Sequence, residues 1–277
     1  MTTLLTRQDR PKGVVNPAAA RKAFRLERYL PAPDLAPFVD YFWLVEWRLP
    51  DGATHVQRTL PYPCANLVFD YGATALFGVV TGPFEYTLRG HGRVLGVRFR
   101  PGGLRRFLGT SMHAITDTTV PTAPLFGWIE DEAERQIFAA PDDAAMIAAA
   151  STLLRVCLPA SHDGVARIER IVDIIRDDQS ITQVQQLSDR TQLSVRRLQL
   201  LFRDWVGVGP KWVIRRNRLH DAADQLANGA EVDLASLAQS LGYFDQAHFT
   251  SDFEKLVGRP PADYRRACRA GAPAGAP

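Results

Sequence analysis

The chain has 277 residues, of which 46% are apolar and 23% are charged, and its formal net charge is +3. This length and composition predict a globular protein of two domains, and so small a net charge indicates no class of partner by itself. The three cysteines lie far apart and form no CxxC pair, which argues against structural zinc and against a disulfide framework. No signal-like segment and no run of eighteen apolar residues occurs, so we expect a soluble, reduced protein of the cytoplasm.

The first half of the chain carries strand-like segments from about Phe38 to Arg100. They are short, rich in aromatic and β-branched residues, and separated by Gly and Pro, which is typical of a small barrel or sandwich. The segments are 41–49, 55–60, 65–72, 74–82, 84–90 and 93–103. Three helix-like segments follow, at 104–109, 125–140 and 142–158.

Aromatic residues in this half are candidates for an effector pocket, although an ordinary barrel core explains them more simply. They are Trp43, Trp47, Phe69, Tyr71, Phe77, Phe84 and Tyr86. Another interpretation makes this half a dimerisation surface, with 146–158 as the contact helix. The small residues from Ala148 to Ser151 would permit close helix packing there.

The second half is helical and contains an internal repeat. Residues 159–164 predict a linker, and no strand pattern occurs from Val165 to Arg269. Residues 184–213 align with 234–264 once one residue is inserted in the second turn. The paired positions are Leu187 and Leu237, Leu198 and Phe249, Phe202 and Phe253, Gly207 and Gly258, and Pro210 and Pro261. Each copy predicts a short helix, a tight turn, a longer helix and a Gly-x-x-Pro stop, which is the helix-turn-helix pattern.

Capping residues and a connecting segment support this interpretation. Thr182 and Asp233 are expected to precede the first helix of each copy, while Ser194 and Asp245 precede the second. Between the copies, residues 210–229 predict one long helix that begins at Pro210 and ends before Gly229. A rigid helix of this kind would fix the distance between the two motifs.

The repeat, the connecting helix and the segment from Leu237 to Arg265 resemble the DNA-binding domain of AraC-type transcription regulators, over about 165–266. The resemblance implies an α+β protein of two domains. The N-terminal domain, 1–158, would be a small β-barrel-like sensor or dimerisation domain with helices. The all-α C-terminal domain, 165–270, would hold two helix-turn-helix motifs joined by a long helix. Residues 271–277 would form a disordered tail.

The implied function is sequence-specific binding of double-stranded DNA in successive major grooves, without a cofactor. RNA polymerase, a small-molecule effector and a second copy of the chain are left open as further partners. Cations cluster between residues 190 and 218 with Asp204 as the lone carboxylate, which favours phosphate neutralisation. The expected DNA contacts are Arg196, Arg197, Gln199, Leu200, Arg203, Arg215, Gln246, Ala247, His248 and Ser251.

Arg196 and Gln199 are the favoured base readers, since arginine can grip guanine and glutamine can pair with adenine. Arg197 and Arg203 could read bases, but an equally good interpretation is that they contact only phosphates or Asp204. The phenylalanines of the second copy, Phe244, Phe249 and Phe253, are expected to pack in its core. Three residues depart from the usual family pattern: Gln192 stands where a turn glycine is common, and Leu200 and Ser251 stand where an arginine is common.

Enzymes form the alternative class: a metal-dependent cupin-like protein, or a DNA-repair protein with a DNA-binding domain. Against the first, the histidines His55, His91 and His113 are scattered and no HxH pair exists. Against the second, the clustered N-terminal cysteines of repair relatives are absent. The acidic residues Glu130, Asp131 and Glu134 are expected to form a solvated helix face. We therefore expect neither a metal site nor catalytic residues.

Overall fold

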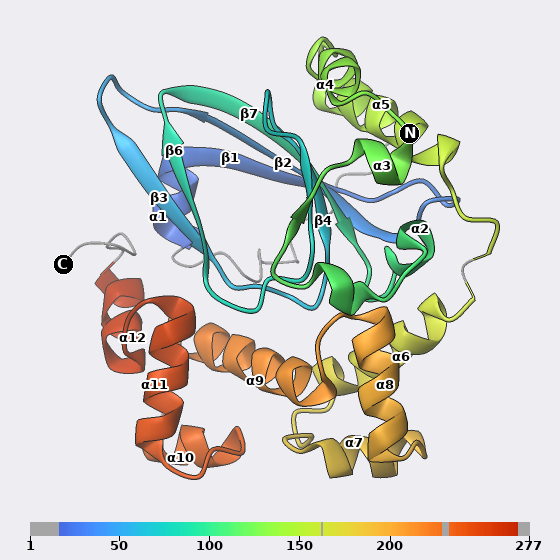
Figure 1. Cartoon of the computed structure of the whole chain (residues 1–277). Helices are drawn as coiled ribbons and strands as arrows, with labels where there is room; N and C mark the ends of the chain where they lie inside the picture. The colour runs from blue at the N-terminus through green and yellow to red at the C-terminus, as the bar shows by residue number, and fades with distance from the viewer. Residues whose placement is uncertain (1–16, 162, 229–232, 271–277) are drawn as a thin grey trace.

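The computed structural model describes residues 17–161, 163–228 and 233–270, and it has a strand-rich N-terminal region and a helical C-terminal region (Figure 1). The proposed tail at 271–277 and Gly229 lie outside the described residues. No described helix is both long enough and apolar enough to cross a membrane.

Two antiparallel sheets make up the N-terminal region. The strands are β1 (Phe24–Tyr29), β2 (Val39–Arg48), β3 (Thr54–Thr59), β4 (Asn66–Phe69), β5 (Ala75–Phe77), β6 (Phe84–Arg89), β7 (His91–Phe99) and β8 (Thr119–Val120). Six of them form one sheet in the order β1-β2-β7-β4-β5-β8, and β3 pairs with β6 separately. The expected strand segments are all present, whereas β1 and β8 were not anticipated. The described strands form two facing sheets and not one closed ladder.

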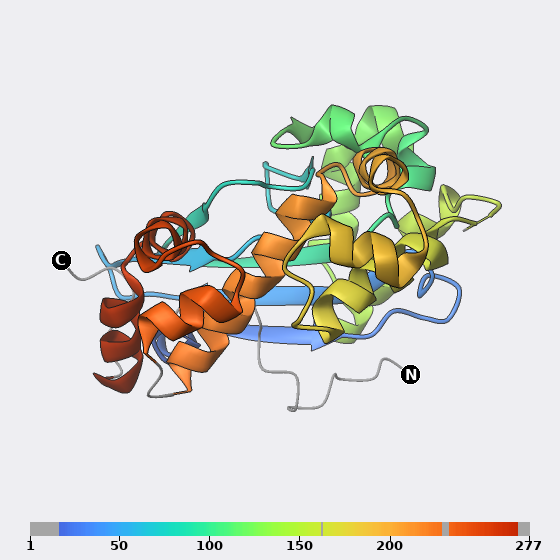
Figure 2. The same cartoon turned by 90° about the horizontal axis from the view of Figure 1, so that it is seen from below.

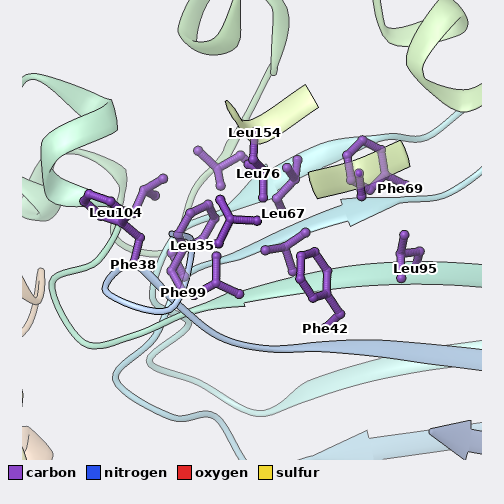
Figure 3. Close-up of a cluster of buried hydrophobic side chains, with 14 of the residues drawn as sticks. Leu35, Phe38, Phe42, Leu67, Phe69, Leu76, Leu95, Phe99, Leu104 and Leu154 are labelled. Atoms are coloured by element: carbon purple, nitrogen blue, oxygen red, sulfur yellow. The ribbon is translucent and has the colours of Figure 1, made fainter. Parts of the chain in front are cut away.

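Helices cover one face of the larger sheet (Figure 1). The helices of the N-terminal region as a whole are α1 (Pro17–Ala23), α2 (Arg105–Leu108), a 3₁₀ turn (Met112–Ile115), α3 (Ala123–Phe126), α4 (Glu130–Phe138) and α5 (Asp143–Val156). In the core of this layer Phe42, Phe69 and Phe99 are fully buried with Leu154 of α5 (Figure 3). The apolar face of α5, proposed above as a contact surface, is therefore used within the chain.

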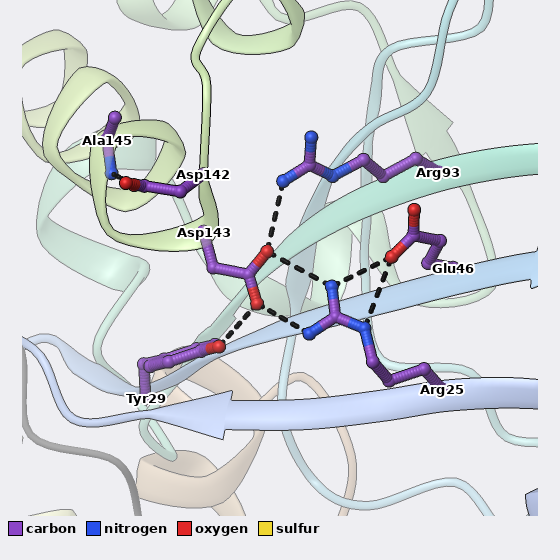
Figure 4. Close-up of polar contacts among 7 residues, drawn as sticks. All are labelled: Arg25, Tyr29, Glu46, Arg93, Asp142, Asp143 and Ala145. Carbon is purple, nitrogen blue, oxygen red and sulfur yellow. Dashed lines mark hydrogen bonds and ion pairs between the residues drawn. The ribbon is translucent and has the colours of Figure 1, made fainter.

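A polar network joins the start of α5 to the edge of the larger sheet (Figure 4). Asp143 accepts hydrogen bonds from Arg25, Tyr29 and Arg93, and Arg25 also pairs with Glu46. The Arg25 guanidinium holds the pKa of Asp143 at about 2, below its ordinary 3.8. Because the folded-state pKa is depressed, this contact stabilises the fold above about pH 4 and is lost as the pH falls toward 2.

In the described part of the C-terminal region, all the regular elements are helices. They are α6 (Val165–Asp177), α7 (Val184–Thr191), α8 (Val195–Trp205), α9 (Pro210–Ala227), α10 (Leu234–Ser240), α11 (Gln246–Val257) and α12 (Pro261–Ala270). Helix α9 belongs to two apolar clusters. Val213 and Ile214 in its first half pack with α6 and α8, and Leu219 and Leu226 in its second half pack with α10, α11 and α12. A single helix thus holds both halves of the region in a fixed arrangement.

Helix α9 also contacts the N-terminal region. Arg216 donates to the carbonyl of Thr81 (2.6 Å), and His220 Nε2 lies 3.1 Å from the carbonyl oxygen of Pro61. Leu60, in the loop after β3, is buried in the same cluster as Leu219. The two regions therefore share apolar and polar contacts along α9, which crosses beneath the strands in Figure 1.

Candidate nucleic-acid interface

The first copy of the repeat consists of α7 and α8. Helix α8 begins at the N-cap Ser194, whose hydroxyl accepts from the backbone N–H of Arg197, as expected. Leu198 and Phe202 on one face of α8 are fully buried. The start of α7 corrects the expectation: its N-cap is Gln183, and a capping box with Gln186 takes the place of a Thr182 cap.

The second copy consists of α10 and α11. Asp233 and Asp245 are the N-caps of these helices and accept from the backbone N–H groups of Ser236 and His248. Phe249 and Phe253 are fully buried, as Leu198 and Phe202 are in the first copy. The alignment of the two copies made from the sequence therefore describes equivalent positions.

Both copies turn through a residue in the left-handed backbone region. Gln192 has φ 55° in the first turn, and Gly242 has φ 79° in the second. A Cβ at Gly242 would lie 2.5 Å from the Cβ of Thr182, so the second turn also packs closely against the segment before α7. Both turns thus use a left-handed residue, although only the second has glycine there.

The second helix of each copy, α8 and α11, has its C-terminal end against the N-terminal region. Gly207, just after α8, accepts from the hydroxyl of Thr116 (2.8 Å), and Gly258, just after α11, lies against the guanidinium of Arg58. The helix N-terminal ends and the turns lie on the side away from the strands (Figure 1). Viewed from below, α8 and α11 are both seen nearly end-on (Figure 2). Two similar helix ends are therefore presented on one side of the molecule.

Side chains on the free faces of these helices are solvent-exposed. The expected contacts in α8 are Arg196, Arg197, Gln199, Leu200 and Arg203, and those in α11 are Gln246, Ala247, His248 and Ser251; all are exposed. Arg215 of α9 is half-buried. Asp204 does not pair with an α8 arginine but with Arg105 of α2 (3.1 Å). The α8 arginines are accordingly not neutralised by Asp204.

A cavity of about 410 Å³ lies between the two sheets of the N-terminal region. Five of the seven aromatic candidates line it: Trp43, Trp47, Phe77, Phe84 and Tyr86. Phe69 instead lies in the core under α4 and α5, and Tyr71 is 71% exposed. Glycines shape the wall, since a Cβ at Gly96 or Gly92 of β7 would overlap the indole of Trp43 or Trp47. The structure thus contains a pocket lined by five of the aromatic residues that were candidates for an effector pocket.

The residues weighed for an enzyme have other roles. Glu134 is buried and accepts from the backbone N–H groups of Gly72 (2.8 Å) and Thr74 (3.4 Å), so it is not part of a solvated face. Glu130 accepts from Thr122. Across the described ranges, no three His, Cys, Asp or Glu side chains are grouped so as to hold a metal ion. Cys64 is buried, and its burial raises the pKa of the thiol.

Two families match the sequence. Residues 187–267 match a helix-turn-helix domain family, and residues 27–121 match a domain of unknown function, DUF6597. Relatives include a protein of Streptomyces lividans named as an AraC-like transcription regulator, 36% identical over 91 residues, and one of Streptomyces antibioticus, 32% identical over 91 residues. The C-terminal region is an AraC-type helix-turn-helix domain. Each match covers 33% of this chain and 30% of the relative, so the chain spans less than a third of their length.

Solved structures also resemble the chain. One is the C-terminal domain of the response regulator yesN from Fusobacterium nucleatum, which is 24% identical. The alignment covers 36% of this chain and 98% of the yesN domain, with a TM-score of 0.33. ToxT from Vibrio cholerae is 11% identical and covers 88% of this chain and 98% of its own, with a TM-score of 0.36.

Several cations of the AraC-type domain are committed to internal contacts, which corrects the expected cluster. Arg216 and Arg218 are buried, and burial lowers the pKa of Arg216 to about 10. Arg218 donates to the carbonyl of Ile175, and Arg190 pairs with Asp178 at 2.6 Å. Arg216 and Arg218 therefore support packing inside the protein, whereas Arg190 is exposed and paired at the surface.

Arg215 has a partner on the second copy. Its guanidinium forms an ion pair with Asp252 of α11 and lies over the ring of Tyr243 at 5.8 Å. The Asp252 side chain is 15% exposed, and His248 lies 3.7 Å from the same carboxylate. The Asp252 carboxylate is thus paired within the AraC-type domain.

Phe244 differs from its expected role. It lies in the turn before α11 and is 96% exposed, whereas Tyr243 beside it is buried. An exposed aromatic ring at the N-terminal end of α11 adds an apolar group to the surface that includes Gln246 and Ala247. The sequence signal for this residue was only its place just before the helix N-cap.

Proposed function

We propose that this protein is a transcription regulator that binds double-stranded DNA through both helix-turn-helix motifs. The N-terminal ends of α8 and α11 would enter successive major grooves on one side of the duplex, with their centres about 34 Å apart. The observation that carries the proposal is the presentation of two equivalent helix ends on the side away from the strands, with every candidate reader on α8 and α11 exposed.

The proposed contacts differ in chemical role. Arg196 and Gln199 would read base edges, since their side chains can form bidentate hydrogen bonds with guanine and adenine. Arg197 and Arg203 would contact phosphates, and Leu200, which is 55% exposed, would meet a thymine methyl group. In the second copy Gln246, Ala247, His248 and Ser251 would face the groove, while Arg215 would lie nearer the backbone. These contacts define the surface to be tested.

Residues 1–158 would then act as the sensor domain and residues 165–270 as the DNA-binding domain. The cavity between the two sheets supports a sensor role, because its size and largely aromatic and aliphatic lining suit a small ligand. Contacts of α9 with Thr81 and Pro61 support control of one domain by the other. RNA polymerase and a second copy of the chain are further proposed partners.

Selection of binding sites from a random duplex pool, with the full chain, tests the proposal. We expect a site with two half-elements about one helical turn apart, and an affinity that falls steeply between about 50 and 200 mM salt because phosphate contacts release counterions. Protection of a single groove segment would refute simultaneous binding by both copies. Absence of duplex binding at low salt would refute the proposed function itself.

A matched pair of variants guards against an unspecific charge effect. Arg196→Ala removes an exposed arginine from α8, and Arg48→Ala removes one from the end of β2. Only the first should change the selected sequence. Equal effects of both changes would indicate a general electrostatic attraction in place of groove recognition.

A further inference from the structure

The turn of the second copy contains one residue that the turn of the first copy lacks. In the first copy the left-handed residue Gln192 is followed by Leu193, which packs against the core, and then by the N-cap Ser194. The second turn has the same order, a left-handed residue and then a buried one, but a further residue precedes its N-cap. That further residue is Phe244. The residue that the alignment inserts in the second turn is therefore an aromatic one.

Hydrogen bonds on both sides fix the backbone around Phe244. Before it, Tyr243 has a buried side chain and donates its backbone N–H to the carbonyl of Ala238 (3.0 Å). After it, the carboxylate of Asp245 accepts from the backbone N–H of His248 (2.7 Å) and caps α11. Because the backbone is already held, only the side chain of Phe244 has to be ordered when it meets a partner, and this lowers the entropic cost of binding.

The ring of Phe244 contributes almost nothing to the fold, since it is 96% exposed. A single exposed ring needs no explanation by itself. In the described part of the C-terminal region, however, the large apolar side chains left exposed are Phe244 and Leu200, and both belong to the proposed DNA-binding surface. Leu200 lies on α8, and Phe244 lies directly before the N-cap of α11. Each copy thus presents one large apolar side chain beside its candidate base readers.

The surroundings of Phe244 carry little positive charge. The turn between α10 and α11 lies on the side of the molecule away from the strands (Figure 1). The first exposed residues of α11 are Gln246, Ala247 and His248, and none of them is a lysine or an arginine. The carboxylate of Asp245 also disfavours an approach of phosphate. This surface therefore suits contact with base edges better than contact with the phosphate backbone.

An apolar ring can recognise one feature of a base pair in the major groove, the C5-methyl group of thymine. The other base edges present hydrogen-bond donors and acceptors there, which a phenylalanine ring cannot satisfy, whereas phenylalanine is among the side chains that contact the thymine methyl group. A ring at the N-terminal end of α11 therefore favours thymine over the other three bases.

We propose that Phe244 is a specificity-determining residue, and that its ring packs against the C5-methyl group of a thymine in the half-element bound by the second copy. The proposal rests on the duplex binding proposed above. Burial of one methyl-sized group corresponds to a factor of about four in affinity, so one thymine is read with about this strength. The contact is apolar and displaces no counterions from phosphate, so its contribution does not depend on salt.

Replacement of thymine by deoxyuridine tests the contact, because it removes the methyl group and keeps every hydrogen-bonding group of the base. The duplex that the full chain selects from a random pool is prepared with each thymine replaced in turn. We expect at least one replacement, in one half-element, to weaken binding about four-fold. With Phe244→Ser the same replacement should have no effect, and Phe244→Leu should retain most of it.

Two controls separate the ring from general effects. Tyr71→Ser removes an exposed ring of the N-terminal region and should leave both the affinity and the thymine dependence unchanged. The loss of affinity in Phe244→Ser should be the same at about 50 and 200 mM salt, whereas a loss that shrinks with salt would indicate a phosphate contact and overturn the proposal. Circular dichroism should show an unchanged fold, because the ring of Phe244 is almost fully exposed.

The outcomes distinguish this proposal from the proposed function. If the unaltered chain binds no duplex at low salt, both fail. If it binds a selected duplex but the site contains no thymine, or if Phe244→Ser keeps the same thymine dependence, the contact is wrong and the proposed function stands. Should Phe244→Ser bind DNA as the unaltered chain does but lower transcription with added RNA polymerase, the ring would serve a protein partner and the thymine contact would again be wrong.

Discussion

The two helix-turn-helix copies have the same backbone design and different surfaces. In each, a left-handed residue makes the turn and a side-chain cap begins the second helix. Yet α8 exposes three arginines and a leucine, whereas α11 exposes glutamine, alanine, histidine and serine. The same fold thus supports one strongly cationic surface and one nearly neutral surface.

The difference shows where each copy uses its charges. Those of α8 face solvent, and the carboxylate beside them, Asp204, pairs with Arg105 in the N-terminal region. At the second copy, Arg215 and Asp252 pair with each other. We infer that the first copy contributes more to electrostatic attraction and base reading, and that the second contributes more through shape and the exposed ring of Phe244.

Removal of the matching core phenylalanines should have the largest effects. Phe202→Ala and Phe253→Ala each delete a fully buried ring, and each should cost about 3–5 kcal/mol of stability. The residues lie in separate clusters that share α9, so the two losses should be similar if the copies are equivalent. Chemical denaturation of both variants measures this. A cost below about 1 kcal/mol for either would show that its copy is not held by the described core.

The turns should separate the copies more clearly. Gly242→Ala places a Cβ 2.5 Å from Thr182 at φ 79° and should destabilise the protein by about 1–3 kcal/mol. Gln192→Gly should change stability by no more than about 1 kcal/mol, since glycine relieves the left-handed strain but adds freedom to the unfolded chain. Thermal unfolding of the two variants decides it. Equal costs would mean that contact with Thr182 does not constrain the second turn.

The repeat could be predicted from the sequence because its signals are local. Within each copy, the helix cap, the spaced apolar residues and the glycine stop lie within a few helical turns of one another. In the second copy these signals are Asp245, Phe249 and Phe253, and in the first copy the cap is Ser194. Strand β1 was missed, although its apolar residues alternate, because what holds it is pairing with β2, from Tyr29 with Phe42 to Phe24 with Trp47, and not a local contact. The burial of Arg216 and Arg218 could not be predicted at all, since their partners are backbone carbonyls of distant segments.

Base reading should differ between the copies. Arg196→Ala should remove about 1–3 kcal/mol of discrimination in one half of the selected site, because a bidentate arginine–guanine contact is lost. Ser251→Ala should change discrimination by less than about 0.5 kcal/mol. Binding-site selection with each variant gives both numbers. If Ser251→Ala relaxed the sequence more than Arg196→Ala, the second copy would be the principal reader.

Substitution of the residues of the ion pair at the second copy should have the smallest effect on DNA affinity. It tests whether Arg215 contacts a phosphate or only pairs with Asp252. If the guanidinium meets a phosphate, Arg215→Ala weakens binding to all duplexes alike. Because Asp252 already neutralises part of this charge, we expect a smaller loss than for Arg203→Ala, which removes an exposed cation of the first copy.

Asp252→Asn gives the opposite sign and so completes the comparison. Loss of the carboxylate frees Arg215 and removes repulsion of phosphates, so DNA binding should tighten even though the protein itself becomes slightly less stable. Arg215 is 41% exposed, and a double-mutant cycle of unfolding should therefore give a coupling of only about 0.5–1 kcal/mol. Titration of duplex DNA with the single and double variants measures the change in DNA affinity. If Asp252→Asn instead bound DNA more weakly, the ion pair would serve to position α11 in its groove. Arg215 would then support DNA binding by holding α11 and not by contacting a phosphate.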